Sequence, residues 1–149
     1  FKNMLLALKQ EGIRGGVFGD IDLDEHRQWI ERVCHDVAIT PHLPLWGNAQ
    51  QEILTDFINS GFEAVMVVAK ADLFGEEWLG RKVDLDFLKE LDELRETKDI
   101  TPCGEVGEYH TFVTDGPLFN QRIEILETNK VLREGHWFLE ILNWELRSK

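Results

Sequence analysis

Cysteine, proline and long apolar runs are all scarce in this sequence. Its 149 residues include two cysteines and four prolines, and no apolar run approaches the ~20 residues that a membrane-spanning helix needs. The two cysteines, Cys34 and Cys103, are far apart in the sequence. A disulfide framework is therefore not expected, and with no signal-peptide pattern at the start we predict a reduced, cytoplasmic setting.

Positive charge is also in deficit. Sixteen Lys and Arg stand against 28 Asp and Glu, which gives a formal net charge of −12. A field of this sign repels phosphate backbones and anionic lipid surfaces. We therefore predict neither a nucleic-acid partner nor a membrane partner.

Helix and strand patterns alternate over residues 1–70, which is typical of a parallel α/β sheet. Short apolar runs at 15–18 and 64–69 are predicted strands, and 42–46 is predicted to be the end of another strand. The segments between them carry apolar residues at helical spacing. Asp22 followed by Glu25 predicts a capping-box start for the second helix. The run 64–69 has apolar residues at both its odd and its even positions, as expected for a strand whose two faces are both covered.

The pattern changes after Lys70, where a second, smaller unit is predicted over 71–149. An apolar stripe near Phe87 and Leu91 predicts one helix, and alternating apolar residues then predict an antiparallel or mixed sheet. The predicted strands are 109–114, 122–126 and 137–144, with turns at 115–117 and 128–130.

Polar residues follow two of the predicted parallel strands, at the edge where open α/β sheets bind ligands. Asp20 has the chemistry to hold Mg²⁺ or a ribose hydroxyl, and Trp46 has the face to cover an adenine ring. From position alone, helix capping by Asp20 and simple packing by Trp46 are the more common roles of such residues. Arg27 and Glu31 are four apart on one helix, so they form either a pocket-organising pair or a solvated surface pair.

The densest group of reactive side chains lies in the segment from Cys103 to Thr111. Glu105 and Glu108 could bind an ammonium ion or take its proton, while Gly104 and Gly107 allow tight backbone turns. A solvated acidic turn is the competing interpretation. Cys103 has no His partner fixed by the sequence, and no cysteine or histidine here shows the paired spacing of a zinc site.

Several segments together resemble the diphthine ammonia ligase family of N-type ATP pyrophosphatases. The specific ones are Gly104-Glu105-Val106-Gly107-Glu108-Tyr109 and Asp115-Gly116-Pro117-Leu118-Phe119, and Gly19-Asp20-Ile21, Pro44-Leu45-Trp46 and Leu79-Gly80-Arg81 occur in the matching order. The resemblance implies an α/β fold. Residues 1–70 would be the C-terminal portion of a Rossmann-like (HUP-type) parallel sheet domain, and 71–149 a smaller α+β domain.

This resemblance also implies ATP-dependent amidation of a carboxylate acceptor by ammonia, with ATP and Mg²⁺ bound. The family's Ser-Gly-Gly-Lys-Asp-Ser phosphate loop does not occur in these residues, so we expect this segment alone to be inactive. Trp29 replaces an Arg of many members, and His26 and His110 resemble a bacterial branch, so the identity of the carboxylate acceptor stays open. A homo-oligomer is possible, and the sequence does not decide it. The alternative is a non-catalytic nucleotide-sensing or protein-binding module. The implied roles are catalysis for Glu105 and Glu108, cofactor binding for Asp20, Trp46, Gly104 and Gly107, and substrate binding for Arg27, Glu31, Tyr109 and Thr111.

Overall fold

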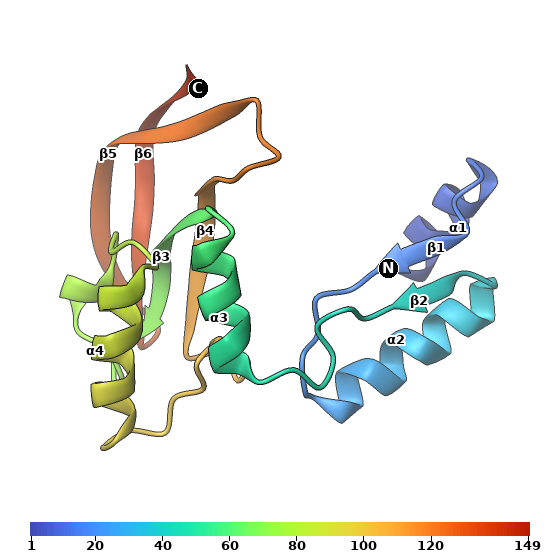
Figure 1. Ribbon diagram of the computed structural model, residues 1–149, viewed down its shortest axis with the longest axis horizontal. Coiled ribbons are helices and arrows are strands. Elements are labelled where there is room, and N and C mark those ends of the chain that lie inside the picture. The colour runs from blue at the N-terminus through green and yellow to red at the C-terminus, as the bar shows by residue number, and fades with distance from the viewer. The chain divides into compact units, whose positions relative to one another are not determined.

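Two sheets organise residues 1–149, all of which the computed structural model describes. A parallel two-stranded sheet lies in the unit Phe1–Ala49, and an antiparallel four-stranded sheet lies in the unit Gln50–Lys149. Figure 1 shows the first unit in blue to cyan and the second in green to red. The predicted α/β class is confirmed.

The first unit alternates helix and strand, as predicted. Its elements are α1 (Lys2–Gln10), β1 (Gly15–Val17), α2 (Asp24–Val37) and β2 (Thr40–His42). Strands β1 and β2 pair in parallel, and α2 is the crossover between them. Gly12 ends α1 with φ of +95°, a conformation that favours glycine.

One face of α2 supplies most of the first unit's small core. Ile30, Cys34 and Val37 are buried and share a helical face, and Leu5 of α1 and Ile39 pack against them. Burial raises the pKa of the Cys34 thiol, so this side chain behaves as a small apolar group.

The start of α2 differs from the prediction. Leu23 occupies the N-cap position and makes no side-chain cap, so the helix does not begin at Asp22 as expected. Asp24 and Glu25 lie in the first turn, where their negative charges are favourable beside the helix dipole.

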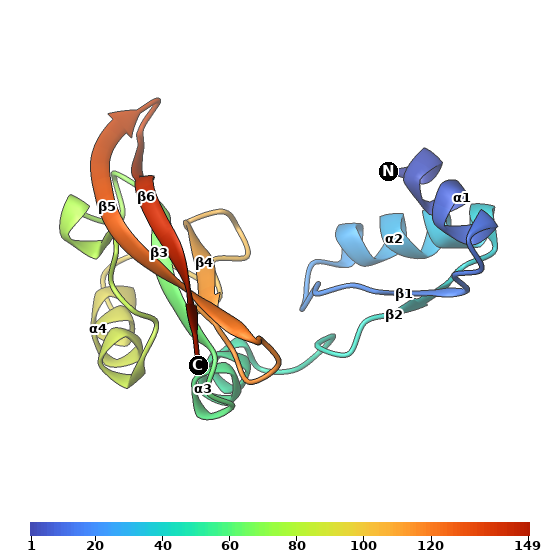
Figure 2. The same ribbon diagram turned by 90° about the horizontal axis from the view of Figure 1, so that it is seen from above.

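The second unit places two helices on one face of its sheet, whose strand order is β4-β3-β6-β5. Helices α3 and α4 both contribute to the core that covers this face, and Figure 2 shows them on the same side of the strands. The longest helix of the chain, α2, has 14 residues, and no helix is long and apolar enough to span a membrane. The elements are α3 (Gln50–Asn59), β3 (Glu63–Lys70), the 3-10 helix η1 (Glu76–Trp78), α4 (Leu85–Arg95), β4 (Tyr109–Asp115), β5 (Gln121–Arg133) and β6 (His136–Ser148).

Strand β3 corrects one expectation. The apolar run 64–69 was expected in the parallel sheet, but β3 pairs antiparallel with both β4 and β6. An apolar run reports burial and carries no information on the direction of its neighbours, which come from distant segments. The contacts place β3 in the second compact unit, and the division into domains at residue 70 stays a prediction.

Aromatic side chains fill the core under α4. Phe74, Trp78, Phe87 and Tyr109 meet edge to face, with ring centroids 5.3 to 6.0 Å apart. Phe87 and Phe74 are almost completely buried. This cluster fixes the start of β4, next to the glycine-rich segment.

The β5–β6 hairpin is longer than predicted. The turn expected at 128–130 lies inside β5, and the chain instead reverses at Glu134 and Gly135, which have φ of +48° and +78°. Figure 1 shows this ribbon continuing past the ends of α3 and α4. Polar residues at 128–130 are tolerated in the strand because they are exposed.

Candidate functional site

The glycine-rich segment forms a loop that closes on the carboxylate of Glu108. This side chain is only 3% exposed. Its Oε1 accepts a hydrogen bond from the Thr101 N–H at 2.6 Å, and its Oε2 accepts one from the Val106 N–H at 2.9 Å. One buried carboxylate therefore ties together two points of the loop.

The same contacts determine the ionisation of Glu108. Burial raises the pKa of this carboxyl, but hydrogen bonds from Thr101, from its own N–H and from Val106 outweigh burial and leave the pKa below its ordinary value. The group is charged at neutral pH and is a weak proton acceptor.

Each backbone N–H from Cys103 to Gly107 already has an acceptor within the second unit. A phosphate-binding loop needs several such donors pointing outward. This loop instead turns its donors inward. The acceptors are Gln50 Oε1 for Cys103 (2.9 Å), the Thr101 carbonyl for Gly104 (3.2 Å), Thr101 Oγ1 for Glu105 (2.8 Å), Glu108 Oε2 for Val106 (2.9 Å) and the Gly104 carbonyl for Gly107 (2.9 Å).

Gly104 and Gly107 are needed for different reasons. Both have positive φ, +71° and +78°. A Cβ on Gly104 would lie 2.7 Å from the Tyr109 carbonyl oxygen, whereas a Cβ on Gly107 would meet nothing within 4 Å. Gly104 therefore permits close backbone approach, and Gly107 only a left-handed turn.

Tyr109 connects the loop to the aromatic core. Its hydroxyl donates a hydrogen bond to the Pro102 carbonyl, and burial raises the pKa of the phenol, so it stays protonated. The ring itself packs in the aromatic core.

A cavity of about 350 Å³ opens over this loop. It brings together five predicted site residues and adds a thiol and an imidazole from the same segment. Glu108 is not among its lining residues, because its carboxylate is buried within the loop. The lining residues are Cys103, Gly104, Glu105, Gly107, Tyr109, His110 and Thr111.

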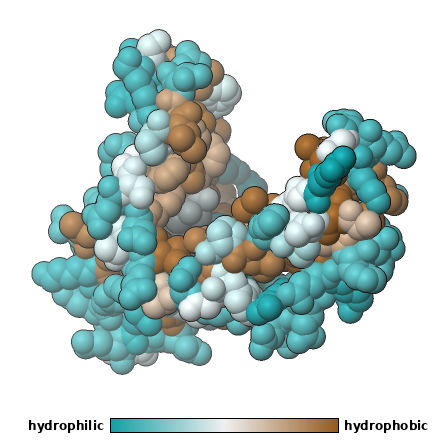
Figure 3. Space-filling view, turned by 45° about the vertical axis from the view of Figure 1, so that its right-hand side comes forward, coloured by the Kyte–Doolittle hydropathy of each residue, from teal (hydrophilic) through white to brown (hydrophobic).

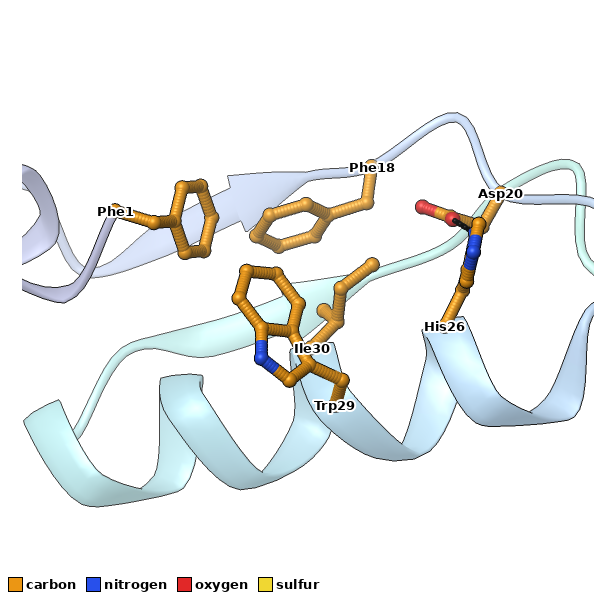
Figure 4. A pocket seen from close by; sticks show the side chains of 6 residues that line it. All are labelled: Phe1, Phe18, Asp20, His26, Trp29 and Ile30. Carbon is orange, nitrogen blue, oxygen red and sulfur yellow. Dashed lines mark hydrogen bonds and ion pairs between the residues drawn. The ribbon is translucent and has the colours of Figure 1, made fainter. Parts of the chain in front are cut away.

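In the first unit, Asp20 contacts a histidine. Asp20 Oδ1 and His26 Nδ1 lie 3.2 Å apart. Figure 4 shows the two side chains facing each other at one end of a cavity of about 400 Å³. The other lining side chains are mainly apolar and include Phe18 and Trp29, so Asp20 and His26 supply its ionisable side chains.

Arg27 joins two other predicted residues. Its Nε donates to Glu31 Oε1 at 2.7 Å, and its guanidinium lies 5.0 Å from the centroid of the Trp46 ring. Both members of the ion pair are more than 40% exposed, so the pair adds little to stability. It does hold Arg27 beside Trp46.

A further cavity, of about 300 Å³, lies on the sheet of the second unit. It is lined by Phe112, Ile123, Ile141 and Trp144. Figure 3 shows hydrophobic surface, in brown, over this sheet. No sequence prediction singled out this face.

Residues 49–145 match the family described as Diphthamide synthase C-terminal domain. The chain belongs to this family. The matched range begins at the boundary of the second compact unit and contains the whole Glu108-centred loop.

Curated relatives extend the similarity to the first unit. The chain is 34% identical over 140 residues to a diphthine–ammonia ligase of Danio rerio, covering 93% of this chain and 54% of that protein. It is 32% identical over 133 residues to the Bos taurus protein of that name (89% and 49%). With the Homo sapiens protein, also named diphthine–ammonia ligase, it is 30% identical over 142 residues (95% and 53%). The chain thus spans about half the length of these relatives.

Within this family member, the loop unites Gly104, Glu105, Gly107, Tyr109 and Thr111 around one cavity. In the first unit, Arg27 contacts Glu31 and Trp46, and Asp20 contacts His26. The resemblance also leads us to predict that Asp20, Trp46 and the loop lie around one cleft. Asp20 and Trp46 belong to one unit and the loop to the other, so this stays a prediction.

Sequence reasoning missed Thr101 and Gln50, although both hold the loop. The Thr101 N–H and hydroxyl bind Glu108 and the Glu105 N–H, and Gln50 accepts from the Cys103 N–H. A threonine before a Pro-Cys-Gly turn was the available signal for the first. Gln50 is 53 residues from its partner, so no local pattern could have indicated it.

Proposed function

We propose that this chain is part of an ATP-dependent amide-forming ligase. The relatives' name describes a ligase that joins diphthine and ammonia, and this supports the reaction class for the chain. The acceptor we propose for this protein is a carboxylate, without choosing between a small molecule and a protein side chain.

The proposed reaction has two steps. The acceptor carboxylate attacks the α-phosphorus of ATP, which forms an acyl adenylate and releases pyrophosphate. Ammonia then attacks the acyl carbon, the C–O bond to AMP breaks, and the nitrogen loses a proton. Because ammonia is mostly ammonium at neutral pH, a nearby carboxylate both attracts it and takes its proton.

The inward hydrogen bonds of the loop are the observation that carries this assignment. With its N–H donors occupied, the loop offers the cavity a carboxylate from Glu105, a ring from His110 and a hydroxyl from Thr111. Such groups suit an ammonium ion or amine better than a triphosphate. We therefore assign Glu105 and Glu108 to the amidation step, with Tyr109 and Thr111 on the substrate side.

Nucleotide contacts are proposed for the first unit. Asp20 has a carboxylate for a ribose hydroxyl, and Trp46 has an aromatic face, although Arg27 lies over that face here. Arg27 with Glu31 would then organise the substrate pocket. For Gly104 and Gly107, the inward N–H groups favour a conformational role over contact with ATP.

Magnesium is the cofactor that ATP chemistry of this kind implies. No group of three or more His, Cys, Asp or Glu side chains in the chain could hold a metal ion. Asp20 is a single carboxylate with one oxygen beside His26. The residues present do not form a magnesium site by themselves.

Replacing Glu105 by Gln tests the proposal in the natural gene product. The charge is lost with little change in shape, so amide formation should fall by about 10²- to 10⁴-fold while ATP affinity changes little. AMP and pyrophosphate are the expected products, measured by nucleotide chromatography. Glu93→Gln, on the exposed face of α4, is the matched control. ADP and phosphate as the only products would reject the reaction class, and unchanged amide formation in E105Q would reject the role of Glu105.

A second candidate function is a non-catalytic module that binds another protein. The exposed apolar cavity of Phe112, Ile123, Ile141 and Trp144 favours it, because such patches often mark interaction surfaces. Wild-type natural gene product that forms no AMP from ATP with any carboxylate acceptor would favour this candidate.

A further inference from the structure

We propose that Glu108 is a positioning residue that holds the 101–107 loop in the shape that presents Glu105 to the cavity. Glu108 therefore does not itself exchange a proton with the substrate. This inference rests on the proposed function and gives the two carboxylates different roles. Glu105 faces the ligand, and Glu108 acts through the backbone.

The two glutamates differ in their surroundings although they are three residues apart. Glu105 is partly exposed and lines the cavity. Glu108 is 3% exposed, with each carboxylate oxygen engaged by a backbone N–H. A proton placed on Glu108 would displace at least one of these bonds and leave a buried donor without an acceptor.

Further contacts connect Glu108 to the rigid part of the unit. Its carbonyl accepts a hydrogen bond from the Lys70 N–H at 2.9 Å, which fixes it to the end of β3. The next residue, Tyr109, is locked into the aromatic core. The anchor is therefore fixed by the sheet, and the loop takes its shape from that anchor.

Thr101 completes the connection to Glu105. The Thr101 N–H donates to Glu108, and the Thr101 hydroxyl oxygen accepts from the Glu105 N–H at 2.8 Å. Displacing the Glu108 carboxylate would release Thr101 and, through it, the backbone of Glu105. The effect on Glu105 is thus transmitted by two consecutive hydrogen bonds.

Amide hydrogen exchange, measured by NMR on the 149-residue chain, tests the anchor without any need for activity. Glu108→Gln keeps one acceptor oxygen and places an NH₂ against the other donor, so the Thr101 or Val106 amide should exchange about tenfold faster or more. Glu108→Ala should release both amides, and Glu105→Gln should release neither. In the wild type, acid titration should move the Thr101 and Val106 amide shifts together, and E108Q should abolish that movement. Wild-type exchange rates in E108Q would overturn the proposal.

Rescue by the conservative variant distinguishes positioning from proton transfer. In the natural gene product, E108Q should retain a rate of amide formation clearly above that of E108A, because one loop bond remains. If Glu108 were the base, Gln and Ala would lose activity equally while E108Q kept wild-type amide exchange. Should E108A not fold, the comparison of E108Q with E105Q still decides, since only E108Q should combine fast amide exchange with reduced activity. Wild-type protein without ligase activity would count against the proposed function alone, because the exchange experiment stands without it.

Discussion

At the scale of single residues, the loop contains a matched pair of glycines. Gly107→Ala introduces only left-handed strain and should cost about 1–2 kcal/mol. Gly104→Ala adds overlap with the Tyr109 carbonyl oxygen, 2.7 Å from the new Cβ, and should cost about 2–4 kcal/mol in all. Urea unfolding of both variants measures the difference. Equal losses would contradict the close approach at Gly104.

Glu108 should also leave a signature in the acid stability of the chain. Its pKa in the folded state is lowered, so below the ordinary glutamate pKa of about 4.3 the unfolded chain binds more protons. The stabilisation is complete above that pH and is lost as pH falls through the folded-state pKa. Unfolding free energies of the wild type should therefore drop more steeply below pH 4.3 than those of E108Q. Parallel pH profiles would contradict this linkage.

The residues gathered at the loop could be predicted from the sequence, but the different roles of Glu105 and Glu108 could not. Glycine and acid types indicated a tight turn with carboxylates, and five predicted site residues of this segment, three of them glycine or acid, do line one cavity. Glu105 and Glu108 are chemically identical, so only the folded path of the loop buries one and exposes the other. Gln50, which holds Cys103, comes from another element altogether.

At the scale of elements, α4 begins at a true side-chain cap. Asp84 Oδ1 accepts a hydrogen bond from the Phe87 N–H at 2.9 Å. Asp84→Ala should cost about 1 kcal/mol, and Asp84→Asn much less. Thermal unfolding measures both. Glu93→Ala, an exposed change within the same helix, is the control and should stay close to the wild type.

Elements with local signals were predicted, and those set by distant partners were not. Helix α2 follows from apolar residues at helical spacing, and the β1–β2 parallel pair follows from the alternation of helix and strand. The partners of β3 come from β4 and β6, far along the chain, so its own apolar run could not specify antiparallel pairing. The turn predicted at 128–130 was wrong. Its residues are typical of turns, but they lie in an exposed part of β5, where polar side chains are tolerated.

At the scale of the whole molecule, the two units differ in the size of their cores. Five buried residues make the core cluster of the first unit, and twelve make that of the second. The family match, 49–145, also coincides with the second unit. The second unit thus has the features of an independently folding domain.

We therefore expect residues 50–149, produced alone, to fold. The segment keeps all four strands of its sheet, both covering helices and every hydrogen bond of the Glu108 loop described above. It should show a cooperative thermal transition and the same slow amide exchange at Thr101 and Val106 as the 149-residue chain. Residues 1–49 alone bury too little apolar surface for a stable fold and should unfold without a cooperative transition. A segment 50–149 lacking a cooperative transition would contradict this expectation and would show that its stability depends on the first unit.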